Sequence, residues 1–118
     1  MRQTVEQWMR VHDTDNVHVV RFCAPALVEQ NAIQLIGDEL YRLAAPSESR
    51  LLLNLESVRD ISSAMLAKII ELDRRLKMVE GRLVLCGLQP AVRDVFTVTH
   101  LHRILGIYAD ETEALAHF

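Results

Sequence analysis

The sequence predicts an α/β domain with a mixed sheet of four or five strands and about four helices packed against it. Two observations carry this prediction. Short apolar blocks at Leu51–Leu55 and Leu83–Cys86 are typical of strands that are covered on both faces. Between them, residues 65–79 repeat apolar side chains at helical spacing and place charged side chains on the other side. A strand, a helix and a second strand in this order form a right-handed unit with parallel strands.

Composition predicts one globular domain over residues 1–118, with 50% hydrophobic and 25% charged residues. The net charge of −3 favours neither nucleic acid nor an anionic membrane as a partner. No apolar run is long enough to span a membrane and no signal peptide is evident, so we expect a cytoplasmic protein. Cys23 and Cys86 each lie in an apolar, strand-like segment, which predicts two buried, unreactive free thiols.

Residues before the central unit predict a hairpin and then a helix. Trp8–His12 and Val17–Cys23 are the expected strands, and Asp13–Asn16 joins them because Asp and Asn favour turns. Pro25 ends the extended structure. Apolar residues at helical spacing then predict a helix over residues 28–45.

The serine pair Ser62–Ser63 lies where the central helix is expected to begin. Unpaired backbone N–H groups and the positive end of the helix dipole meet at such a position. A serine hydroxyl there can cap the helix, or it can carry a phosphate. At the other end, Gly81 is expected to form a left-handed cap.

Three further elements are predicted toward the C-terminus. Pro90 opens a helix that ends near Thr99, because proline is well tolerated in a first helical turn. The apolar stretch of residues 101–107 is expected to form a short edge strand. Residues 111–118 predict a terminal helix that Asp110 caps.

Residue patterns favour a binding protein over an enzyme. Nucleophilic catalysis by Ser62 or Ser63 would need a base that a third group orients, and no motif places a histidine there. His100 and His102 are close in sequence but have no third ligand at metal-binding spacing. No glycine-rich loop is present to hold a nucleotide. We therefore expect no catalytic residue, no metal site and no cofactor.

Two stretches carry a family resemblance. Residues 58–67 read Val-Arg-Asp-Ile-Ser-Ser-Ala-Met-Leu-Ala, and residues 81–90 read Gly-Arg-Leu-Val-Leu-Cys-Gly-Leu-Gln-Pro. The first resembles the motif Asp-Ser-Ser-Gly-Leu-Gly that opens a helix in the STAS domain family, the fold of bacterial anti-sigma factor antagonists. The second resembles that family's Gly-Arg-Leu strand and its Gln-Pro helix start. The resemblance covers nearly the whole chain, although Ser62 replaces the family's Asp, and Ala64 its second Ser.

This resemblance implies a phosphorylation switch. Ser63 aligns with the serine that the family phosphorylates, and Ser62 is the second choice. The implied partner is an anti-sigma factor or a related serine kinase, which binds the unphosphorylated domain and is released by phosphorylation. The residues expected to contact it are Asp60, Ile61, Ser62, Ser63, Ala64 and Met65. Two alternatives stay open: a scaffold that binds other STAS proteins without phosphorylation, and a small-ligand sensor.

Overall fold

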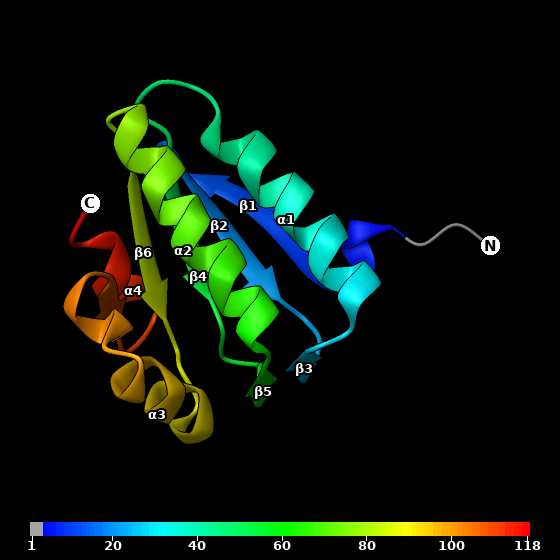
Figure 1. The fold of residues 1–118 in the computed structure, drawn as a ribbon. Coiled ribbons are helices and arrows are strands. Elements are labelled where there is room, and N and C mark those ends of the chain that lie inside the picture. Colours follow the sequence, from blue (N-terminus) through cyan, green and yellow to red (C-terminus); the bar gives the residue numbers. More distant parts are fainter. Residues whose placement is uncertain (1–3) are drawn as a thin grey trace.

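A computed structural model describes residues 4–118 and confirms the α/β architecture (Figure 1). One sheet has the strand order β1-β2-β4-β6-β7. Its strands are β1 (Met9–Thr14), β2 (Val17–Phe22), β4 (Arg50–Asn54), β6 (Arg82–Cys86) and β7 (Gly106–Tyr108). Strand β1 is antiparallel to β2, and all other neighbours in this sheet are parallel. The sheet is therefore mixed, as predicted.

The helices divide between the two faces of the sheet. Helices α1 and α2 lie side by side over one face, whereas the short helix α4 packs on β4, β6 and β7 (Figure 1). Helix α3 follows the carboxyl end of β6. The bounds are α1 (Gln30–Ala44), α2 (Ser63–Met78), α3 (Pro90–Val98) and α4 (Glu111–Leu115), with 3-10 turns η1 (Val5–Gln7) and η2 (Leu101–Arg103).

The predicted hairpin between β1 and β2 is confirmed, with a tighter turn than expected. Asp15 and Asn16 have φ values of 49° and 65°, so both lie in the left-handed region that a two-residue hairpin turn requires. Both strands consequently extend to the turn. Trp8 does not belong to β1 as we expected, because it closes the 3-10 turn η1 instead.

Two hydrophobic cores result, one on each face of the sheet. The larger lies between the sheet and α1, α2 and α3, and it includes Leu53 and Ile69, which are fully buried. The smaller lies between the sheet and α4. Its buried members are Val17, Val19, Leu52, Val84, Cys86 and Ala114.

Two sequence-based predictions in this fold are wrong, and a third is confirmed only in part. Ile70 belongs to the apolar residues of 65–79 that were expected to be buried, but it is 44% exposed. Cys23 is exposed, because β2 ends at Phe22, whereas Cys86 is buried as predicted. Residues 101–107 begin as the turn η2, and only Gly106–Tyr108 forms the expected edge strand.

The end of α2 also differs from the prediction. Glu80, not Gly81, takes the left-handed conformation, with φ of 59°. Glycine is required at position 81 for a different reason, since a Cβ atom there would lie 2.3 Å from the carbonyl oxygen of Ser49.

Candidate functional site

The two serines at the start of α2 have different tasks. Ser62 is the N-cap: it is extended, and its Oγ accepts a hydrogen bond from the backbone N–H of Met65 at 3.2 Å. Ser63 is the first helical residue, and its side chain is exposed and takes no part in the cap. One serine therefore stabilises the helix, and the other presents its hydroxyl to solvent.

A small two-stranded sheet fixes the backbone that leads into this helix. Strand β5 (Asp60–Ile61) pairs in parallel with β3 (Ala26–Leu27), which precedes α1. The backbone N–H of Ser62 donates to the carbonyl of Leu27 at 3.1 Å, and the N–H of Arg59 donates to Pro25 at 2.7 Å. The serine pair is thus held from a segment more than thirty residues earlier in the chain, which sequence reasoning did not foresee.

Residues 60–65, predicted as a contact segment, divide by burial. Asp60, Ser63 and Ala64 are exposed and Ser62 is half-buried, so these side chains are accessible to a partner. Ile61 is 8% exposed and Met65 is fully buried, because both pack into the larger core. These last two side chains support the surface from beneath and are not available for direct contact with a partner.

The electrostatic surroundings of Ser63 suit an anion. The first turn of α2 contains no acidic side chain. The positive end of the dipole of this 16-residue helix is therefore not neutralised by a carboxylate of the helix itself, and the nearest acidic residue before it in the sequence is Asp60. A phosphate on Ser63 would be stabilised by the start of the helix.

A second polar cluster lies at the same end of the sheet, on the α4 side. Arg21 donates two hydrogen bonds to Glu111, both of 2.7 Å, and Asn54 donates one of 2.6 Å to the same carboxylate. These bonds, chiefly the one from Arg21, lower the pKa of Glu111 to about 2. An aspartate at position 54 would instead repel Glu111, so asparagine suits this neighbour. The contacts join residues 57 and 90 positions apart, which explains why the sequence did not reveal them.

The remaining candidates from the sequence are placed apart from these residues. His100 and His102 lie near α3, with ring centroids 6.2 Å apart. Within residues 4–118, no three His, Cys, Asp or Glu side chains gather as a metal site would need. In the same part of the chain, no helix combines the length and apolar character needed to cross a membrane.

The chain is similar in sequence to known proteins. The family model described as STAS domain matches residues 9–114. The chain is 31% identical over 96 residues to BtrV of Bordetella bronchiseptica, named as an anti-sigma factor antagonist, and the match covers 81% of this chain and 83% of that protein.

Solved structures share the fold at lower identity. An anti-sigma-factor antagonist (STAS) domain protein from Planctomyces limnophilus is 24% identical with a TM-score of 0.82, covering 92% of this chain and 96% of that chain. The Bacillus cell fate determinant SpoIIAA in its phosphorylated form is 21% identical with a TM-score of 0.68, covering 92% of this chain and 97% of that chain.

Proposed function

The chain belongs to the STAS domain family, whose relatives here are named anti-sigma factor antagonists, and from this premise we propose that it is a phosphorylation-controlled interaction module. In this proposal, an anti-sigma factor of the serine-kinase type binds the unphosphorylated domain in the cytoplasm. Phosphorylation of Ser63 then releases that partner. The domain acts by binding and performs no catalysis of its own.

One observation carries the choice of Ser63 over Ser62. The hydroxyl of Ser62 is half-buried and accepts the capping hydrogen bond from Met65, whereas that of Ser63 is exposed and does not cap the helix. A phosphate on Ser63 therefore leaves the helix cap intact. A phosphate on Ser62 would replace the capping hydroxyl with a bulky dianion at a partly covered position.

The proposed contact surface comprises Asp60, Ser62, Ser63 and Ala64. The kinase transfers the γ-phosphoryl group of ATP to the Oγ of Ser63, which loses its proton as ADP leaves, so nucleotide and magnesium belong to the kinase. The product carries about 1.5 to 2 additional negative charges at neutral pH. The start of α2 tolerates that charge, but a partner shaped for a small neutral hydroxyl meets a hydrated dianion and loses affinity.

The decisive experiment separates stability from recognition at Ser63. Ser63→Asp should keep the free energy of unfolding within about 1 kcal/mol of the parent, because a negative charge is tolerated at this helix end. Its affinity for the kinase partner, identified by pulldown from the source organism, should fall about tenfold or more. Ser63→Ala is the matched control, because it stays small and uncharged and should keep the partner.

Phosphosite mapping of the same pulldown completes the test. Phosphate on Ser63 supports the proposal. If Ser62→Asp and not Ser63→Asp abolishes binding, the phosphorylated serine is Ser62. Recovery of other STAS proteins with no phosphate on either serine would replace the switch with a constitutive scaffold, and a metabolite retained in native mass spectra would replace it with a ligand sensor.

A further inference from the structure

A second surface lies at the C-terminal halves of α1 and α2, away from the serine pair. A cleft between the two helices is lined by Tyr41 and Ala44 of α1 and by Arg75, Met78 and Val79 at the end of α2. We call it the Tyr41 cleft. Its floor is mostly apolar, and Met78 is 71% exposed at its edge.

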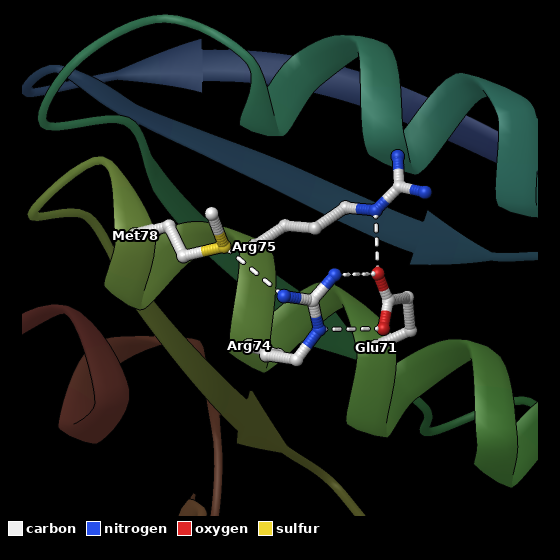
Figure 2. A network of polar contacts seen from close by, with 4 residues as sticks. All are labelled: Glu71, Arg74, Arg75 and Met78. Atoms are coloured by element: carbon white, nitrogen blue, oxygen red, sulfur yellow. Dashed lines mark hydrogen bonds and ion pairs between the residues drawn. The ribbon is translucent and has the colours of Figure 1, made fainter.

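Arg75 is held in place but keeps its binding groups free. Its guanidinium carbon lies 3.8 Å from the centroid of the Tyr41 ring, and its Nε donates to Glu71 at 2.8 Å. In Figure 2 the two terminal nitrogens of Arg75 point away from Glu71. Within residues 4–118 they make no hydrogen bond. A guanidinium fixed on one edge and on one face is pre-organised to bind a carboxylate with its free edge.

Glu71 does not compete for that free edge, because Arg74 already occupies both carboxylate oxygens of Glu71. Arg74 donates to the two Glu71 oxygens at 2.8 and 2.6 Å and uses its third nitrogen to contact the Met78 sulfur at 3.1 Å (Figure 2). The hydrogen bonds from the two arginines lower the pKa of Glu71 to about 2, so it stays ionised at neutral pH. Arg74 also holds the exposed Met78 at the cleft edge.

A second cation reaches the same tyrosine ring. The side chain of Lys68 lies across Gly37, where a Cβ atom would come within 2.9 Å of its Cδ. The ammonium group lies 5.6 Å from the centroid of the Tyr41 ring and forms no ion pair within the described residues. The absent side chain at position 37 therefore lets Lys68 lie beside the Tyr41 ring.

The local charge has the opposite sign to that of the whole chain. Arg74 and Arg75 line the cleft and Lys68 lies beside its tyrosine ring, whereas only two acidic side chains, Glu71 and Asp38, lie close to Tyr41. The chain as a whole carries a net charge of −3. A cationic, partly apolar cleft on an acidic protein matches a partner that carries both a carboxylate and an apolar side chain.

We propose that the Tyr41 cleft is a docking surface for an acidic segment of a protein partner. One carboxylate of that segment binds the terminal nitrogens of Arg75, and a second, neighbouring carboxylate pairs with the ammonium of Lys68. An adjacent apolar side chain packs on Tyr41 and Met78, whose flexible thioether adapts to different shapes. Arg75 lies 12 positions after Ser63, about 18 Å along the helix axis, so the docked segment is held independently of the phosphorylation state.

The test uses two synthetic peptides, blocked at both ends and followed by NMR on the full 15N-labelled chain. The first has two glutamates followed by two leucines, and the second has two lysines in place of the glutamates. The acidic peptide should shift the amide signals of residues 41–45 and 68–79, and the basic peptide should not.

Matched variants identify the groups responsible. Arg75→Gln should weaken binding of the acidic peptide about threefold to fivefold, as expected for an exposed ion pair. Arg10→Gln changes an exposed arginine on β1, outside the cleft, and should have no effect. Gly37→Ala keeps every charge but displaces Lys68, so it should weaken binding while α1 stays folded. Ser63→Asp should leave binding unchanged, which separates a failure of this proposal from a failure of the phosphorylation switch.

Several results would overturn the proposal. Unchanged affinity in Arg75→Gln would do so, as would shifts centred on residues 60–64, or no shifts at millimolar peptide. Binding to phosphatidylglycerol vesicles in place of the peptide would assign the cleft to a membrane. Sedimentation that reveals dimers dissociated by Arg75→Gln would assign it to a second copy of the chain.

Discussion

Helices α1 and α2 cover one face of the sheet and α4 covers the other. Successive residues of a strand point to opposite faces, yet the two helix layers are attached to the sheet in different ways. Within residues 4–118, the first face contributes to a core of 26 buried residues and the second to a core of 6. Leu53 faces the first and its neighbour Leu52 the second, although both are fully buried.

The difference lies in what fastens each covering helix. Helix α2 places five buried side chains on the larger core. Helix α4 has five residues, of which only Ala114 is fully buried, and polar contacts of Glu111 with Arg21 and Asn54 join its first turn to the sheet. A short helix that adds one fully buried side chain can open locally at a lower cost than α2, because its opening uncovers only the smaller core. The following predictions test this contrast.

The largest effect is expected on the face covered by α1 and α2. Ile69 is fully buried in the middle of α2, so Ile69→Asp would bury an unpaired carboxylate. The cost should be several kcal/mol, comparable with the whole stability of a small domain. We expect insoluble or unfolded protein by circular dichroism. A soluble variant with the parent's melting curve would show that the side chain at position 69 can reach solvent and that this core is not rigid.

A matched pair on one strand compares the faces directly. Leu53→Ala should cost about 3 to 5 kcal/mol, because the rigid layer of α1 and α2 leaves the cavity open. Leu52→Ala should cost less, about 2 to 3 kcal/mol, because α4 can settle into the space. Urea denaturation measures both. Equal costs would mean that α4 is as firmly fixed as the two long helices.

Loosening α4 alone should expose the core beneath it. Glu111→Gln removes the ion pair with Arg21 and should cost about 1 kcal/mol. Burial, with the nearby charge of Glu111, raises the pKa of the Cys86 thiol to about 12, so it should resist alkylation until α4 opens. In a Cys23→Ser background, the rate of Cys86 alkylation should rise about fivefold in Glu111→Gln. An unchanged rate would show that apolar packing, not Glu111, controls the opening.

The smallest effect is a dependence of stability on pH. The folded-state pKa of Glu111 is about 2, below its ordinary value of 4.5. Its stabilising contribution is therefore complete above pH 4.5 and is lost as the pH falls toward 2. The melting temperature should fall less steeply over this range in Glu111→Gln than in the parent. Glu71 titrates over the same range on α2, so only the difference between the two curves belongs to α4.

Elements defined by local pattern were predictable from the sequence. The helical spacing of residues 65–79 predicts α2, and the apolar blocks on either side of it predict β4 and β6. In each case the spacing of apolar residues within the segment indicates which side chains are buried. The caps Ser62 and Asp110 were also predictable, since a cap depends only on nearby backbone groups.

Features that depend on distant partners could not be predicted in this way. The pairing of β3 with β5 fixes the serine pair, but each strand has only two residues and no periodicity of its own. The bonds of Arg21 and Asn54 to Glu111 likewise join sites that a single sequence does not connect. The same holds for Gly81, whose need for glycine comes from Ser49 on another segment.

Arg21 and Glu111 lie far apart in the sequence, so α4 joins the sheet late when the chain folds during synthesis. A chain is synthesised from its N-terminus, and folding begins while synthesis continues. Strands β1, β2, β4 and β6 with α1 and α2 are complete once residue 86 has been made, and the last members of the larger core follow by Leu105. The larger core can therefore form first. The smaller core must wait for residues 106–115. During that interval the nascent chain exposes Leu52, Val84 and Cys86 to solvent and to neighbouring chains.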